Sequence, residues 1–143
     1  MAKNYKTPII VEHIDGDGFH IFTEVKIGRK RYRALIDTGA SKSVIDLQTA
    51  ESIKKLEWVD NLATQAKGLG TEGMETKVAR LPKLKIGELA IEDLYLGILD
   101  LSHITGMYHS LGIEPFSLIL GGDILQEYDA VINYGKSSLT LKV

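Results

Sequence analysis

The 143-residue chain contains no cysteine, which excludes disulfide bonds, thiolate metal sites and a cysteine nucleophile. It also has almost no excess charge, because 17 Lys and Arg residues stand against 19 Asp and Glu residues, so no overall field attracts nucleic acid or an anionic membrane. No apolar run reaches membrane-spanning length, and the N-terminal stretch lacks the apolar core of a signal peptide. We therefore expect a cytoplasmic protein that binds neither nucleic acid nor a membrane.

What is present is the composition of a globular domain, with 44% hydrophobic and 25% charged residues. The length suffices for one ordinary domain and is too short for two well-packed ones. We see no repeat, no low-complexity segment and no linker. The sequence therefore predicts a single domain over residues 1–143.

Short apolar or alternating segments separated by turns run through the chain. A nine-residue alternation over 19–27 has the period of a half-buried strand, and turn signals such as Asp15-Gly16-Asp17-Gly18 punctuate the pattern. Strands are predicted at 8–14, 19–27, 32–37, 62–67, 74–81, 84–86, 89–99, 117–120, 130–133 and 138–141. The pattern is typical of a mainly β barrel-like or sandwich domain with short helices.

Two short helices and one still shorter helical segment are predicted among these strands. Asp46 can cap a helix that runs to Leu56, and a helical turn or two is expected over 123–128. Ser102 can cap the other helix, with Gly112 at its C-terminal end. The residues expected to face inward from this helix are Ile104, Met107, Tyr108 and Leu111.

One strand ends in an acid that is followed only by small residues. Ala34-Leu35-Ile36 leads into Asp37, and Thr38-Gly39-Ala40 comes directly after it. A strand-end turn explains Asp-Thr-Gly alone, because Asp and Gly are common turn residues. A partly desolvated carboxyl beside a second one can instead share a proton with it, so that the pair acts as base and acid. That chemistry requires two aspartates, and the chain has one such motif.

Three motifs in order resemble the retropepsin-like aspartic proteases of the single-domain bacterial and retroelement type. The first is Ala34-Leu35-Ile36-Asp37-Thr38-Gly39-Ala40 with the later Val44-Ile45. The second is Leu118-Ile119-Leu120-Gly121-Gly122-Asp123-Ile124-Leu125, which is similar to the family's hydrophobic-hydrophobic-glycine element and its adjoining helix. The third is 130–134 with 139–141, similar to the closing strands. The resemblance implies a closed β-barrel of the acid protease fold.

The resemblance also implies a homodimeric aspartic endopeptidase in which each chain contributes one Asp37 at the two-fold axis. A water between the two aspartates would attack the scissile bond of a peptide, without metal or other cofactor. By the same resemblance, Thr38 would join the two active-site loops, Gly39 would present its carbonyl to the substrate, and Leu120-Gly121 would pack beneath the loop. The residues implied at the site are Asp37, Thr38, Gly39, Ala40, Leu120 and Gly121.

The chain departs from the viral members at two positions. In those members, an acid two residues beyond the motif's glycine and an arginine next to the later glycine brace the dimer, and here these positions hold Ser41 and Gly122. The resemblance therefore predicts a dimer that is braced otherwise or is weaker. Residues 100–116 also exceed the compact viral pattern.

A glycine-rich stretch over 68–73 has more than one interpretation. Gly68-Leu69-Gly70-Thr71-Glu72-Gly73 spells the dinucleotide-binding fingerprint, but the segment over 74–82 is strand-like and too short for the helix that this fingerprint requires. A mobile hairpin is the plain alternative. By the resemblance the stretch is the flap that closes over the substrate, where glycines permit motion and close backbone approach.

The remaining polar and aromatic residues have structural interpretations. His13, His20, His103 and His109 have spacings that do not favour a metal site. The basic residues at 29–33 are expected at a solvated hairpin tip. Trp58 is expected to pack, and Asp123 is expected to cap the helix that begins there.

Two alternatives to a protease remain open from the sequence. One is a catalytically silent dimer of the same fold that holds a peptide in the cleft, and the intact Asp-Thr-Gly argues against it. The other is a monomeric structural β-domain, which predicts no dimer at practical concentrations.

Overall fold

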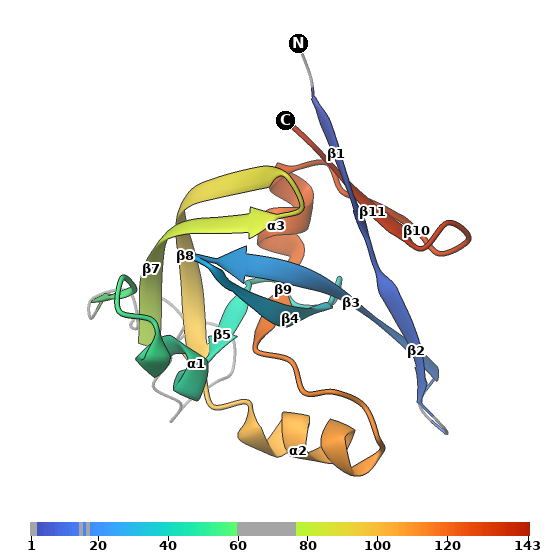
Figure 1. The fold of residues 1–143 in the computed structure, drawn as a ribbon, viewed down its shortest axis with the longest axis horizontal. Coiled ribbons are helices and arrows are strands. Elements are labelled where there is room, and N and C mark those ends of the chain that lie inside the picture. Colours follow the sequence, from blue (N-terminus) through green and yellow to red (C-terminus); the bar gives the residue numbers. More distant parts are fainter. Residues whose placement is uncertain (1–2, 15, 17, 60–76) are drawn as a thin grey trace.

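A computed structural model describes residues 3–14, 16, 18–59 and 77–143, and these residues are mostly β-strand (Figure 1). The strands are β1 (Asn4–Pro8), β2 (Ile10–Ile14), β3 (Gly18–Ile27), β4 (Lys30–Ile36), β5 (Val44–Asp46), β6 (Glu57–Val59), β7 (Lys77–Ile86), β8 (Leu89–Leu99), β9 (Leu118–Leu120), β10 (Val131–Asn133) and β11 (Ser138–Lys142). The helices are α1 (Leu47–Ser52), α2 (Ser102–Ser110) and α3 (Gly122–Glu127).

The larger sheet closes into a barrel. Its strand order is β2-β3-β4-β9-β5-β8-β7-β6. An additional pairing between β3 and β7 closes the six strands β3, β4, β9, β5, β8 and β7 into a ring. The neighbouring pairs β4–β9 and β5–β8 are parallel, whereas the others in this sheet are antiparallel. The prediction of a mainly β, closed barrel with short helices is confirmed.

The two ends of the chain form a second, three-stranded sheet of order β1-β11-β10. Figure 1 shows this sheet beside the barrel, with both termini at the same end. The segment predicted as a single strand over 8–14 is divided between the two sheets, because β1 ends at Pro8 and β2 begins at Ile10.

Strand β7 is longer than the sequence predicts. Two separate strands around a proline are expected at 74–81 and 84–86, yet β7 runs unbroken from Lys77 to Ile86. The register with β8 passes from Leu81↔Leu94 to Lys83↔Glu92 and skips Pro82 and Asp93. Asp93 has a φ of 53°, and the pairing is interrupted at this one position, where Pro82 has no N–H to donate to the ladder, while the register continues unchanged on both sides. The predicted strand at 62–67 lies outside the described residues.

Helix α1 is positioned by a side-chain cap at its first turn. Asp46 Oδ2 accepts from Thr49 N–H at 3.4 Å, which satisfies one of the unpaired N–H groups at the helix start. The helix ends at Ser52, earlier than the predicted end at Leu56. None of the helices in the described part of the chain combines the length and the apolar character needed to cross a membrane.

Helix α2 differs most from its predicted packing. It has no buried residue, and Ile104, Met107 and Leu111 are 43%, 58% and 56% exposed, so the prediction that they face inward is wrong. Ser102 is not the cap either, because Leu101 occupies that position without a side-chain hydrogen bond. Gly112 does lie just beyond the helix with a φ of 80°, a conformation that glycine adopts at no steric cost.

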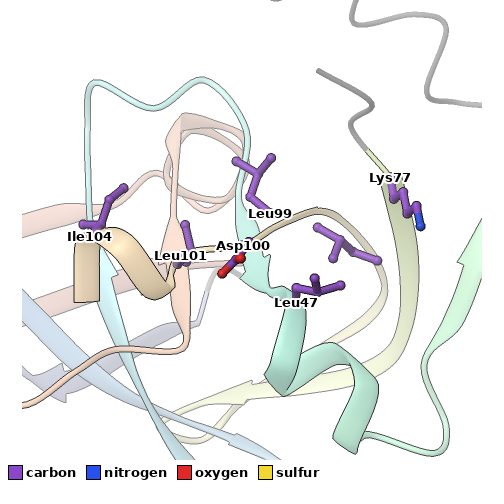
Figure 2. A pocket seen from close by; sticks show the side chains of 7 residues that line it. Leu47, Lys77, Leu99, Asp100, Leu101 and Ile104 are labelled. Atoms are coloured by element: carbon purple, nitrogen blue, oxygen red, sulfur yellow. The ribbon is translucent and has the colours of Figure 1, made fainter. Parts of the chain in front are cut away.

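Ile104 lies at the edge of an open hollow where α2 comes after β8 (Figure 2). The hollow has a volume of about 470 Å³ and is mostly apolar. It is lined by Leu47, Lys77, Ile98, Leu99, Asp100, Leu101 and Ile104.

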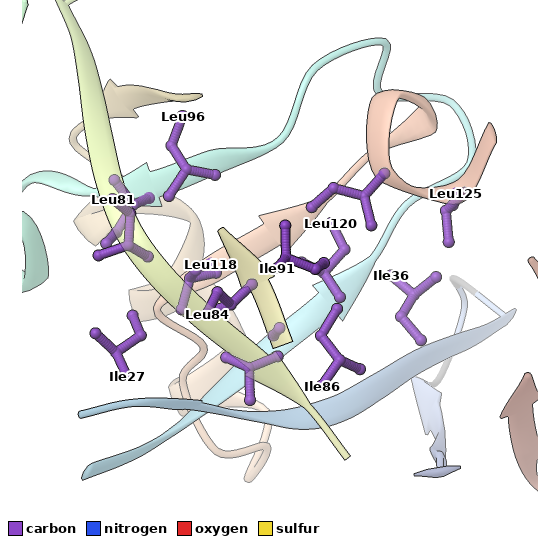
Figure 3. Close-up of a cluster of buried hydrophobic side chains, with 14 of the residues drawn as sticks. Ile27, Ile36, Leu81, Leu84, Ile86, Ile91, Leu96, Leu118, Leu120 and Leu125 are labelled. Atoms are coloured by element: carbon purple, nitrogen blue, oxygen red, sulfur yellow. The ribbon is translucent and has the colours of Figure 1, made fainter. Parts of the chain in front are cut away.

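The main hydrophobic cluster fills the barrel interior (Figure 3). This cluster includes Ile36 from β4, the strand before Asp37. It also includes Leu118 and Leu120 from β9, the strand before Gly121-Gly122, which we call the glycine pair. A smaller cluster lies beside it and contains Ile14, Phe22, Leu35, Leu101, Ile113 and Phe116, with Tyr108 of α2 packed against it. The strand before Asp37 is therefore packed on both faces, as its apolar sequence predicts.

Two side chains lie elsewhere than predicted. Arg33 is not solvated, because its side chain is only 14% exposed, its guanidinium carbon lies 4.1 Å from the centre of the Phe22 ring, and it pairs with Glu12 at 3.3 Å. Trp58 is not packed inside, since it lies on the edge strand β6 and is 41% exposed. The Lys77 ammonium lies 5.7 Å from the centre of its ring.

Candidate active site

Asp37 stands directly after β4, where the strand leaves the barrel core. The parallel ladder with β9 ends at the pair Ile36↔Leu120, and the Asp37 N–H continues it by donating to the Leu120 carbonyl at 3.0 Å. The preceding residues Ala34, Leu35 and Ile36 are buried, whereas Asp37 is half-buried and Thr38 and Gly39 are exposed. The core thus fixes the backbone of the aspartate while its carboxyl group reaches the surface.

A tight turn orients the Asp37 carboxylate. Its Oδ1 accepts from Gly39 N–H at 2.9 Å, and its backbone carbonyl accepts from Ala40 N–H at 3.1 Å. A Cβ atom at residue 39 would lie 3.3 Å from that same Oδ1, so a larger residue would crowd the acid. The small residues of the motif therefore serve a local purpose, since they let the main chain turn around the carboxylate and hold it.

The glycine pair packs directly against the loop that carries Asp37. The Gly122 N–H donates to the Ala40 carbonyl at 2.6 Å. A Cβ atom at residue 121 would lie 2.7 Å from the Ala40 carbonyl oxygen and 2.9 Å from the carbonyl carbon and oxygen of Lys42. The structure thus brings Leu120 and Gly121 to the loop, and the space at position 121 admits only glycine.

A second group of contacts, not predicted from the sequence, lies at the far end of the loop. Ser43 is fully buried, and its hydroxyl donates to Asp123 Oδ1 at 2.7 Å while accepting from Gly121 N–H at 2.9 Å. The Ser43 N–H donates to Asp123 Oδ2 at 3.0 Å. Asp123 also accepts from Ile124 N–H of its own helix, but the prediction that it caps this helix is wrong, because Gly121 is the N-cap and Asp123 lies in the first turn. A hydroxyl residue just before a buried strand was the available signal.

The acids bonded near the loop are already engaged. Both oxygens of Asp123 accept hydrogen bonds, and so do both oxygens of Asp46, from Thr49 N–H and from Leu101 N–H. Acceptors occupied in this way hold structure together and are poorly suited to exchanging protons with a substrate. Among these three acids in the described part of the chain, Asp37 is therefore the one whose carboxyl group is available for acid–base chemistry.

The structure does not reach every residue named from the sequence. The glycine-rich stretch from Gly68 to Gly73, interpreted as a flap, lies outside the described residues. Over the residues that are described, no group of three or more His, Cys, Asp or Glu side chains could hold a metal ion.

In a comparison with protein families, residues 23–124 match the model described as aspartyl protease. This range contains the Asp-Thr-Gly loop, the glycine pair and Asp123. A comparison with curated protein sequences finds no match.

Solved structures share the architecture at low sequence identity. The retroviral protease-like domain of Ddi1 from Leishmania major superposes with a TM-score of 0.57 at 16% identity, covering 84% of this chain and 86% of that one. A retropepsin-like aspartic protease from Rickettsia conorii superposes with a TM-score of 0.56 at 17% identity, covering 99% of this chain and 92% of that one. At these identities the likeness establishes the retropepsin-like fold.

Proposed function

Since the chain belongs to the aspartyl protease family, we propose that it is an endopeptidase that uses Asp37 as its catalytic acid and base. The observation that carries the proposal is the placement of this carboxyl, which a packed strand delivers to a surface loop of small, exposed residues. A structural aspartate in a turn has no need of so many anchors. Here contacts from Leu120, Gly121 and Gly122 all reach the short loop that carries it.

We further propose that the working enzyme is a homodimer. Hydrolysis by this chemistry needs two carboxyls, one to accept a proton from water and one to donate a proton to the scissile carbonyl. The resemblance to the retropepsins implies that Asp37 of a second copy completes the pair, and Asp46 and Asp123, the acids bonded near the loop, are engaged in hydrogen bonds within their own chain. In a two-fold symmetric dimer the same surface of each chain forms the interface, so two copies of one residue can meet at the axis and no second motif is needed in the sequence.

In the proposed reaction a peptide lies extended across the cleft, held by main-chain hydrogen bonds in the manner of an added strand. One Asp37 takes a proton from a bound water, which attacks the peptide carbonyl. The partner's Asp37 gives its proton to the carbonyl oxygen. As the C–N bond then breaks, the first Asp37 passes the proton it took from water to the leaving nitrogen, and the partner's Asp37 takes a proton back from a hydroxyl of the intermediate, which leaves a carboxylic acid and an amine. The shared proton belongs to the pair, so the pH profile of cleavage reports on both carboxyls together, with activity falling as pH rises and the proton is lost.

The test is digestion of a diverse peptide mixture between about pH 4 and 7, the range around ordinary carboxyl values. Wild-type protein and Asp37→Asn are compared at high protein concentration. Asparagine keeps an oxygen that can accept from Gly39 N–H, so the turn is retained while the titrating group is lost. We expect cleavage by the wild type alone, strongest at acid pH.

Equal cleavage by both proteins would refute the proposal, because the activity would then not depend on Asp37. Absence of cleavage by either would favour the silent dimer that binds a peptide in the same cleft. Binding of the same peptides to both proteins, measured by calorimetry, would then identify that function.

A further inference from the structure

We propose that Ser43 and Asp123 are positioning residues that fix the catalytic loop, so that the rate of the chemical step depends on a hydrogen-bonded pair remote from the substrate. This inference rests on the proposed function. It concerns residues that do not belong to the Asp-Thr-Gly motif and that reach Asp37 only through the backbone of residues 37–43.

Residues 120–123 hold the loop at three successive positions. At the beginning, Leu120 accepts from the Asp37 N–H, and in the middle Gly122 donates to the Ala40 carbonyl. At the end, Gly121 and Asp123 hold Ser43. The first two attachments use only main-chain atoms, and the close approach that they need requires glycine at position 121. The third depends on the side chains of residues 43 and 123.

The third attachment is a closed network in which every buried group is satisfied. The Ser43 hydroxyl donates to Asp123 and accepts from Gly121, while the Ser43 N–H donates to the other Asp123 oxygen. Ser43 is fully buried and Gly121 is buried, so water cannot replace a lost partner there. Hydrogen bonds to an ionised carboxylate are shorter and stronger than those between neutral groups.

The network requires a carboxylate at position 123 and not merely a side chain of the same shape. Both Asp123 oxygens accept, one from the Ser43 N–H and the other from the Ser43 hydroxyl and from Ile124 N–H. Asparagine has one acceptor oxygen, so whichever way it is turned its NH₂ group faces an N–H donor. The Asp123→Asn change therefore breaks the attachment with no change in side-chain volume.

Ser43 also links the loop to the barrel on its other side. Its carbonyl accepts from Gly97 N–H of β8 at 3.0 Å, and β5 begins at the next residue. The Ser43 main chain is therefore already held toward the barrel, and the contact with Asp123 fixes its position relative to the glycine pair. Without that contact, the part of the loop between Ala40 and Ser43 gains freedom, and the turn over 37–40 that orients the Asp37 carboxylate is held less firmly.

Asp46 provides a matched control, because it is the same residue type in a similar environment. It is half-buried like Asp123, and it also accepts from two main-chain N–H groups, those of Thr49 and Leu101. Its partners belong to α1 and to the start of α2, not to the loop that carries Asp37. Asp46→Asn therefore reproduces the chemical change and its effect on folding stability without releasing the loop.

The test measures kcat and KM for Asp123→Asn, Ser43→Ala, the double variant and Asp46→Asn, at protein concentrations where specific activity no longer rises. We expect Asp123→Asn and Ser43→Ala each to lower kcat by about 100-fold with little change in KM, because a small displacement of a catalytic group has that effect. The double variant should fall no further than either single variant, since the two residues act as one unit. Asp46→Asn should keep its kcat within about threefold of the wild type.

Hydrogen exchange of assigned amides gives a second readout that does not depend on activity. Asp123→Asn should accelerate exchange at the Ser43 amide, and Ser43→Ala at the Gly121 amide, while Asp46→Asn accelerates exchange at Thr49 and Leu101 only. If the wild type cleaves no peptide, the proposed function fails and this exchange pattern alone decides whether the network fixes the loop. Equal losses of kcat in Asp123→Asn and Asp46→Asn, or an unchanged Ser43 amide in Asp123→Asn, would overturn the inference.

Discussion

Replacing Gly121 with alanine tests how closely the glycine element packs against the catalytic loop. The added Cβ would meet three main-chain atoms at 2.7–2.9 Å, the carbonyl oxygen of Ala40 and the carbonyl carbon and oxygen of Lys42. The φ of Gly121 is −105°, which any residue can adopt, so backbone strain at this residue is not the cause of the effect. The methyl group can be accommodated only if the loop that carries Asp37 moves.

The size of the effect depends on this overlap. Overpacking of a tight interior by one methyl group lowers the free energy of unfolding by about 1–3 kcal/mol. For a domain of this length, that corresponds to a fall in melting temperature of about 3–12 °C. Because the displaced atoms belong to the catalytic loop, peptide cleavage should fall by about 100-fold as well.

Gly122→Ala is the matched control at the next position. A Cβ there would lie 3.4 Å from the Ala40 oxygen and 3.9 Å from the Ser41 oxygen, distances close to ordinary contact. Melting curves from circular dichroism and cleavage rates should separate the two variants, with Gly122→Ala close to the wild type. If Gly121→Ala melts within about 1 °C of Gly122→Ala, the close packing of Gly121 against the loop is refuted.

Three further predictions test other parts of the structure. Phe22 is fully buried against Tyr108, Phe116 and Arg33, so Phe22→Ala should lower the free energy of unfolding by about 3–5 kcal/mol in urea titrations, and a loss under about 1 kcal/mol would contradict the packing of the smaller cluster. Met107 is exposed, so Met107→Lys should change the free energy of unfolding by less than about 0.5 kcal/mol. A large loss of stability would show instead that Met107 is buried, as the sequence predicts. Hydrogen bonds from the Ser102 hydroxyl and N–H lower the pKa of Asp100 below its ordinary value of 3.8. The contribution of the Asp100 carboxylate to folding stability is therefore present above pH 3.8 and is lost as the pH falls through the lowered pKa. In an NMR titration Ser102→Ala should raise the pKa of Asp100, and an unchanged midpoint would exclude the hydroxyl as its cause.

The parts of the fold that depend on local pattern could be predicted from the sequence. Strand β8 was predicted with the bounds it has in the structure, because alternation and flanking turns mark it clearly. The motif around Asp37 could be recognised from the sequence because a carboxylate followed by small residues at the end of an apolar strand is an unusual local arrangement. In the folded chain, Leu120 and Gly121 contact this loop.

The errors arose where contacts between distant segments decide the outcome. Helix α2 carries an apolar stripe at helical spacing, but only Tyr108 reaches the smaller cluster, so periodicity alone pointed the other residues the wrong way. Arg33 lies in a basic stretch of the kind usually found on a solvent-exposed surface, yet its side chain packs on the Phe22 ring and pairs with Glu12. Asp123 has the local signature of a helix cap, and its bond to Ser43, 80 residues away in sequence, appears only in the folded chain.

The most direct test of the central claim is to mix wild-type chains with Asp37→Asn chains and measure peptide cleavage at a fixed amount of wild type. If the site forms from two chains, mixed dimers hold one carboxyl only. Random pairing then predicts that an equal amount of the variant leaves about half of the activity and a ninefold excess leaves about one tenth. Activity that stays constant at every excess of the variant would show that each chain holds a complete site, and would contradict the shared pair of Asp37 residues.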